Sequence, residues 1–119
     1  MEEKTMAFSE LETKRIEKIV GTFCENRVPE RVRDQLRNGF RIENQNIFIF
    51  ESRPRWDDPS EWMNLDFAKI TYVTSRGIWK LFWKRASGKW NQYEPHKESK
   101  RIDDLIATID EDRYGCFFG

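Results

Sequence analysis

Residues able to do acid–base, nucleophilic or metal chemistry are few and scattered in this chain of 119 residues. His96 is the only histidine, and no Gly-x-Ser-x-Gly turn exists for it to serve as a base. Because nucleophilic hydrolysis needs a nucleophile beside a base, the sequence favours an isolated surface histidine over a catalytic triad. No glycine-rich phosphate loop is present either.

The carboxylates offer only weak signs of a metal or small-molecule site. Asp57 and Asp58 with Glu61 could hold a hard cation, although the same residues commonly start turns and helices. Glu51 ends an apolar run that basic residues follow, but metal-dependent cleavage needs converging acidic groups, and Glu51 has no evident partner. We therefore expect Glu51 to pair with Arg53 or Arg55, and we predict no metal and no cofactor.

The clearest pattern lies between residues 68 and 95, where three β-prone runs are separated by Arg76-Gly77 and Ser87-Gly88. Such runs with short glycine turns predict a three-stranded antiparallel meander. A two-residue turn at Arg76-Gly77 would pair three large apolar residues with their partners on one side, which should be the core. These predicted pairs are Thr74 with Trp79, Tyr72 with Leu81, and Ile70 with Trp83.

The opposite side of this meander would then be aromatic and cationic, with Val73 facing Lys80, Thr71 facing Phe82 and Lys69 facing Lys84. Like charges directly opposite one another destabilise a sheet. Either solvent screens Lys69 and Lys84, or an anionic partner lies between them. The position of Trp90 stays open, because a two-residue Ser87-Gly88 loop puts it on the core side and a three-residue loop puts it on the other.

A long connection between residues 52 and 66 contains two prolines, consecutive aspartates and two tryptophans. Long connections without regular structure are uncommon and often functional. Arg53, Arg55 and Trp56 therefore make it the first candidate for a binding loop. The alternative is that Trp56 and Trp62 close the end of the core, since large aromatic side chains are usually buried.

Two helical patterns flank these strands. Ser9 and Glu12 have the spacing of a capping box, and a helix to about Cys24 should follow, with an apolar stripe on one face. A second stripe follows Ser99, a predicted N-cap. The stripe residues are Ile16, Ile19, Val20 and Phe23 in the first helix, and Ile102, Leu105, Ile106 and Ile109 in the second.

Shorter elements fill the remaining chain. Pro29 suits the start of a short helix ending at Asn38-Gly39. Residues 40–50 read as a hairpin, and its second strand, 47–50, is apolar on both faces, so it should lie inside the sheet or be covered on each side. The apolar C-terminal end, with Phe117 and Phe118, should pack onto the domain or onto a second copy.

These elements predict an α+β fold: one domain over residues 1–119, with a five-stranded antiparallel sheet packed on one face by the N-terminal and C-terminal helices. Residues 1–7 are polar and are expected to form a flexible lead-in, with the native start near Met6. Whether the first hairpin joins the edge of the strand at residues 68–75 or another edge is not fixed by the pattern.

Charge and cysteine content narrow the partners. The chain has 21 basic and 21 acidic residues, so any binding to nucleic acid must come from a local patch. No long apolar run is present, and we expect no contact with a membrane. Cys24 and Cys116 are too few for a disulfide framework, which predicts reduced thiols in a cytoplasmic protein.

Several short segments are similar to a known family. They are Glu51–Trp56, Trp79–Ala86, Lys89-Trp90, Tyr93–Pro95 and the final Gly115–Gly119. As a set they resemble a small bacterial family of domains of unknown function, number 3024, over nearly everything from Met6 onward. The resemblance implies a single-domain, bacterial, cytoplasmic protein and implies no activity, cofactor or catalytic residue.

Two functional hypotheses follow. The first is a non-catalytic binding or adaptor module, monomeric or homodimeric, whose partner is a protein or a single-stranded nucleic acid, since stacking with local positive charge holds single strands. Its surface would comprise Arg53, Arg55, Trp56, Lys69, Lys80, Phe82 and Lys84. The alternative is a small-molecule or metal-dependent, nuclease-like enzyme with a pocket near Glu51, Asp57 and Tyr93.

Overall fold

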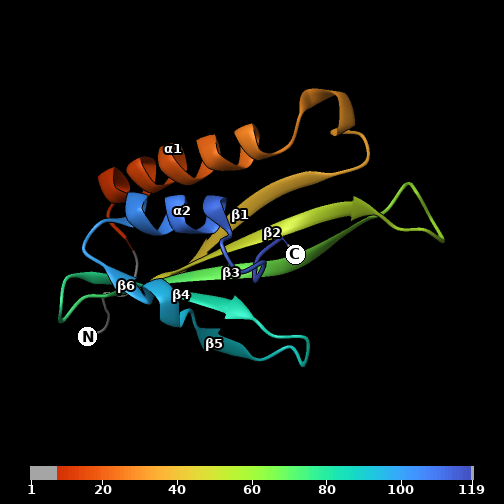
Figure 1. Cartoon of the computed structure of the whole chain (residues 1–119). Helices are drawn as coiled ribbons and strands as arrows, with labels where there is room; N and C mark the ends of the chain where they lie inside the picture. The colour runs from red at the N-terminus through yellow and green to blue at the C-terminus, as the bar shows by residue number, and fades with distance from the viewer. Residues whose placement is uncertain (1–7, 119) are drawn as a thin grey trace.

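Two α-helices lie on one face of a six-stranded antiparallel sheet in the computed structural model, which describes residues 8–118 (Figure 1). The α+β fold with both helices on one face is confirmed, with one strand more than expected. The proposed lead-in at residues 1–7 lies outside the described residues. In chain order the elements are α1 (Glu10–Arg27), a 3₁₀ turn (Glu30–Val32), β1 (Arg37–Glu43), β2 (Asn46–Pro54), β3 (Trp62–Val73), β4 (Ile78–Lys84), β5 (Trp90–Gln92), a 3₁₀ turn (Glu94–His96), β6 (Glu98–Ser99) and α2 (Ile102–Glu111).

The strands are ordered β1-β2-β3-β4-β5, and β6 also pairs with β4. The first hairpin is confirmed, with Asn44 in the left-handed conformation at its turn. It joins the meander through β2 and β3, which settles the edge that the pattern left open. The sixth strand has two residues, too few to carry an alternating pattern, so it could not be predicted from the sequence.

The register between β3 and β4 differs from the predicted one by two residues. Tyr72 pairs with Trp79, Ile70 with Leu81 and Ala68 with Trp83. The turn is longer than expected because the amides of Arg76 and Gly77 both donate to the Val73 carbonyl, at 3.1 and 2.9 Å. A shift of two residues keeps every side chain on its predicted face, since strand side chains alternate with period two.

The same shift removes the predicted contact between two like charges. Lys69 lies opposite Phe82 rather than Lys84, so the expected Lys69–Lys84 pair is wrong. At the second turn Lys84 pairs with Trp90, and Gly88 adopts a φ of 89°, which favours glycine. The Arg85 amide donates to the Lys89 carbonyl at 2.8 Å, leaving a three-residue loop. Trp90 therefore lies on the face of Lys84, away from the helices.

Helix α1 begins with the predicted capping box, in which the Ser9 hydroxyl and the Glu12 carboxylate each accept a backbone amide. It runs one turn beyond Cys24. The Arg33 side chain donates to the carbonyls of Glu25 and Val28 and so satisfies the end of the helix. The predicted second helix is wrong. Only a 3₁₀ turn forms, and Asn38 and Gly39 belong to β1.

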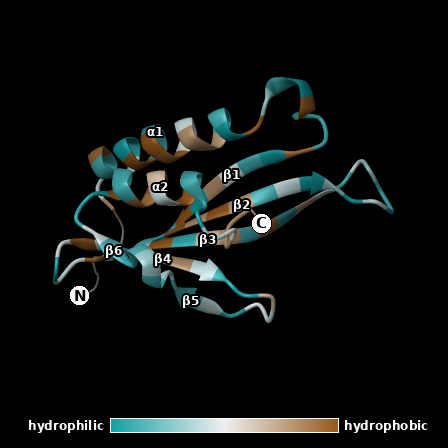
Figure 2. Cartoon of the chain, viewed as in Figure 1, coloured by the Kyte–Doolittle hydropathy of each residue, from teal (hydrophilic) through white to brown (hydrophobic). Residues whose placement is uncertain are grey.

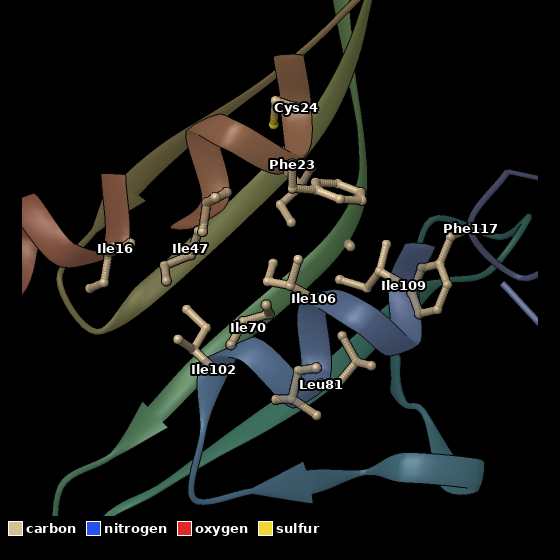
Figure 3. Packing of buried hydrophobic residues seen from close by; sticks show 14 of the residues in the cluster. Ile16, Phe23, Cys24, Ile47, Ile70, Leu81, Ile102, Ile106, Ile109 and Phe117 are labelled. Atoms are coloured by element: carbon tan, nitrogen blue, oxygen red, sulfur yellow. The ribbon is translucent and has the colours of Figure 1, made fainter. Parts of the chain in front are cut away.

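The core lies between the helices and the sheet. Both predicted helix stripes face it, and the side chains of Ile47, Ile49, Ala68, Ile70 and Leu81 meet them from the strands with no exposed surface. Figure 3 shows Ile16 and Phe23 of α1 and Ile102, Ile106 and Ile109 of α2 gathered over Ile47, Ile70 and Leu81. Hydrophobic colouring accordingly follows the sheet and helices, whereas the loop after β2 is hydrophilic (Figure 2).

The C-terminal segment packs onto the domain itself, which is one of the two arrangements that the sequence predicted. Phe117 is buried against Tyr93, with ring centroids 5.0 Å apart, and Phe118 lies 4.9 Å from Phe67. Phe67 is the extra residue of a β-bulge in β3, and the bulge turns it toward the helix side. Asp112, in the left-handed conformation, accepts the amides of Phe117 and Phe118 at 2.9 and 2.8 Å.

Strands β2 and β3 run past the helices to form a projecting arm, which we define as residues 51–65 (Figure 1). Only residues 55–61 are irregular, so the connection is shorter than the sequence suggested. Trp56 at its tip is 92% exposed, and the expectation that it closes the core is wrong. Trp62 instead lies under the guanidinium of Arg37, 4.3 Å from the ring centroid.

Candidate functional site

The face of the sheet opposite α1 and α2, which we call the open face, carries aromatic rings and cations from five strands. Neither α-helix covers it within residues 8–118. Alternation along the strands places its residues: Arg41 from β1, Phe48 and Phe50 from β2, Lys69 from β3, Lys80, Phe82 and Lys84 from β4, and Trp90 from β5. The face is therefore built from residues far apart in sequence.

Lys69 lies at the centre of a cluster of rings. Its ammonium is 4.5 Å from the ring centroid of Phe82 and 5.4 Å from that of Trp90. The Lys84 ammonium is 5.7 Å from the Trp90 ring, and Phe48 and Trp90 are tilted at 56° with centroids 6.1 Å apart. Cation–π contacts of this kind stabilise by about 0.5 to 2 kcal/mol, so they hold the lysines in place without neutralising them.

The charges on this face are not balanced. Asp66 and Glu43 both pair with Arg41, at 2.7 and 2.6 Å, and Glu98 pairs with Arg76 at 3.0 Å. The hydrogen bonds that Arg41 donates, to Asp66 and then to Glu43, raise the pKa of Arg41, so this guanidinium stays charged. Lys69, Lys80 and Lys84 have no carboxylate partner among the described residues, and desolvation by burial lowers the pKa of Lys69. The three lysines are thus available to an anion.

The structure separates the predicted binding residues into two groups. Lys69, Lys80, Phe82 and Lys84 lie together on the open face. Arg53 points to the opposite side of β2, where its Nε donates to Glu51 at 2.7 Å, confirming the expected ion pair. Arg55 pairs with Asp57 on the arm tip, beside Trp56.

Sequence reasoning missed other members of this face. Trp90 could have been assigned only from the length of the turn after β4. Residues 47–50 were expected to lie inside the sheet or under a covering element on each side, and β2 does lie inside the sheet, between β1 and β3. Phe48 and Phe50 are half-buried on the open face, where Phe48 contacts the Trp90 ring and the Arg41 guanidinium. The alternation of Phe with Ile in residues 47–50 was the signal for this placement. Alternate side chains of a strand lie on opposite faces of the sheet, and the helices cover only one of these faces.

Residues of the alternative pocket lie on separate parts of the molecule. Glu51 belongs to β2, Asp57 to the arm tip, and Tyr93 follows β5 on the far side of β3 and β4. Tyr93 is only 2% exposed, and burial raises the pKa of its hydroxyl. Within residues 8–118 no three His, Cys, Asp or Glu side chains gather as metal ligands would.

His96 is half-buried rather than at the surface as expected. Its Nδ1 lies 2.5 Å from the hydroxyl of Thr108. That hydroxyl donates to the Asp104 carbonyl at 2.9 Å, so its oxygen accepts the proton carried by Nδ1. The histidine thus joins the β5–β6 connection to α2.

Cys24 is buried and Cys116 half-buried, and both are free thiols. Neither α-helix in the described part of the chain has the length and hydropathy to cross a membrane.

Comparison with known proteins identifies a family and no function. Residues 8–119 match the model of a domain of unknown function, DUF3024. Searches of curated proteins and of solved structures gave no match. Because the match covers nearly the whole chain, this protein belongs to the DUF3024 family.

Proposed function

We propose that the open face binds single-stranded nucleic acid without catalysis, in the cytoplasm of a bacterial cell. The observation that carries the proposal is the set of three lysines, Lys69, Lys80 and Lys84, which have no carboxylate partner in the described part of the chain and share the open face with half-buried aromatic rings. Single strands are commonly held by aromatic side chains that stack on bases beside cations that contact phosphates. The open face supplies both groups on one surface.

A sheet is a suitable platform for such a ligand. Side chains on neighbouring strands of a sheet are about 5 Å apart. Rings and ammonium groups on one face can therefore alternate from strand to strand at this distance. RNA-recognition domains use sheet aromatics in this way, which is an analogy of physics and not of family. A phosphate near Lys69 would also offset the desolvation that lowers the pKa of this lysine.

The test is titration of labelled single-stranded RNA and DNA of about 12 nucleotides across a salt series. Lys80→Glu with Lys84→Glu should weaken binding and reduce the slope of log K against log salt by about 1.4, because each lost phosphate contact to a single strand removes about 0.7. The matched control is Lys14→Glu with Lys18→Glu, which makes the same charge change on the exposed side of α1. This control should bind like the wild type.

Trp90→Ala separates stacking from charge. We expect it to cost about 1 to 3 kcal/mol of binding free energy and to leave the salt slope unchanged, since no phosphate contact is lost. Absence of binding to both strands at low salt would reject the nucleic-acid proposal and leave a protein as the partner of the open face. Equal losses in the lysine variant and its control would reject the assigned surface.

A further inference from the structure

A cavity opens on the helix side of the sheet, at the end where β3 turns into β4. Its volume is about 210 Å³, and the lining residues that matter here are Phe8, Glu12, Arg15, Tyr72, Trp79, Lys100 and Arg101. We call it the end cavity. It contains none of the open-face residues and lies under the start of α1 and the start of α2.

Three rings form a continuous wall of the end cavity. Phe8 stacks on Trp79 with centroids 5.6 Å apart, and Tyr72 is tilted against Trp79 at 4.7 Å. All three side chains remain half-buried. Each of these rings would bury a large area if it were covered. Here the wall is left accessible from the cavity.

The rim of the end cavity is cationic. Arg15, Lys100 and Arg101 are all exposed. Arg101 has a loose pair with Asp103, at 3.3 Å, whereas Arg15 and Lys100 have no carboxylate partner among the described residues. The one acidic lining residue, Glu12, accepts the Ser9 amide at 2.9 Å and keeps its negative charge, so the rim carries three cations and one anion. The rim therefore attracts negative charge.

From this pairing of an aromatic wall with a rim of net positive charge, we propose that the end cavity binds a small aromatic anion. The ring would lie against Tyr72 and Trp79, and the negative group, a phosphate or carboxylate, would face Arg15 and Lys100. Pockets for small molecules commonly combine an apolar lining with a few charged groups that fix orientation. Charge-assisted hydrogen bonds from arginine and lysine to oxyanions are the strong ones.

The experiment measures binding of phenyl phosphate to the full chain by calorimetry, with thermal shift as a second readout. Benzoate tests whether a carboxylate serves as well as a phosphate. Phenol carries the ring without the charge, and inorganic phosphate carries the charge without the ring. We expect phenyl phosphate or benzoate to bind at least about tenfold more tightly than phenol and inorganic phosphate, which is the ratio expected for one charge-assisted contact.

Arg15→Gln with Lys100→Gln should lose this preference while keeping weak binding of phenol, because the wall is intact. Both side chains are exposed, so the variant should fold. The control, Lys14→Gln with Lys18→Gln, removes two positive charges from α1, the helix that carries Arg15. This control should bind the ligands like the wild type. Trp79→Phe keeps a ring in the wall and should remove any ligand-dependent change of tryptophan fluorescence.

Three results would overturn the inference. They are no saturable binding of either aromatic anion, equal binding of phenol or of inorganic phosphate, and unchanged binding in the Arg15 and Lys100 variant. The open-face variant Lys80→Glu with Lys84→Glu should bind phenyl phosphate normally. Failure of the nucleic-acid proposal therefore leaves this inference standing, and its own failure leaves the open face untouched.

Discussion

Cys24 shows how burial of a single side chain sets a pH limit. The thiol is 5% exposed, and desolvation, with a smaller contribution from Glu25, raises its pKa to about 12. A free thiol titrates near pH 8.5. Above that pH the unfolded chain loses the proton while the folded chain keeps it. The contribution of this group to stability is therefore complete below about pH 8.5 and falls as pH rises toward 12.

We predict that the free energy of unfolding falls by about 2 kcal/mol between about pH 8 and about pH 10.5 through Cys24 alone, at up to about 1.4 kcal/mol per pH unit. Denaturation curves across this range measure it. Cys24→Ala is the control, because it lowers stability by a cavity cost at every pH but removes this slope. Parallel pH profiles for the two proteins would contradict the prediction.

Sequence reasoning worked for those residues whose partner is set by short-range spacing. Glu51 and Arg53 are two residues apart on a strand, so they share a face and pair. Trp90 could not be assigned in the same way, since its face depends on how many residues the preceding turn contains. Tyr72 and Trp79 were predicted on one face of the same hairpin, but their contact with Phe8 was beyond reach, because nothing local in the sequence brings the chain before α1 against this hairpin.

At the scale of elements, the meander shows which part of a register can be predicted. The turn after β3 is two residues longer than expected, yet Ile70 and Leu81 are both buried as the alternating pattern required. An error of an even number of residues changes which side chains are opposite each other and not which face they occupy. Core and open face were therefore predictable, and individual cross-strand pairs were not.

The C-terminal segment depends on Asp112. Its two carboxylate oxygens accept one amide each, from Phe117 and Phe118, and the guanidinium of Arg27 covers the Phe118 ring at 3.8 Å. Asp112→Asn replaces one acceptor by a donor that faces an amide. An unpaired polar group of this kind costs about 1 to 3 kcal/mol. Asparagine also tolerates the left-handed conformation, so the backbone cost is unchanged.

We predict that Asp112→Asn lowers the free energy of unfolding by about 1 to 2 kcal/mol and speeds hydrogen exchange at the Phe117 and Phe118 amides. Chemical denaturation and exchange measured by NMR test the two parts. Asp110→Asn is the matched control, because the Asp110 carboxylate is 60% exposed and lies 3.6 Å from Arg27. Such a surface pair contributes about 0 to 1 kcal/mol. Equal effects of the two changes would show that the segment is held by its rings alone.

At the scale of the whole molecule, the projecting arm determines the shape. The radius of gyration is 15.0 Å and the principal extents are 45 × 30 × 26 Å. A compact domain of this length has a radius of gyration of about 13 Å. The excess agrees with an arm whose tip, residues 55–61, contains no buried residue.

We predict that replacing residues 55–61 by Asn-Gly, a two-residue hairpin turn, leaves the free energy of unfolding within about 0.5 kcal/mol of the wild type. Small-angle X-ray scattering should show a smaller radius of gyration. Pro54 and Trp62 already pair, so the strands need not move. A large loss of stability would mean that the tip supports the body. Unchanged nucleic-acid binding would show that Arg55 and Trp56, which the sequence analysis included in the binding surface, do not take part.

The three-residue loop between β4 and β5 has an evolutionary consequence. Adding or deleting one residue there would turn Trp90 toward the helices, and the same shift would bring Tyr93 out of the position it holds beside Leu81. Insertions and deletions at this loop should therefore be tolerated among descendants only in even numbers. Whether the loop has an odd or an even number of residues, more than which residues it contains, would then be conserved, because this number keeps the Trp90 indole on the open face.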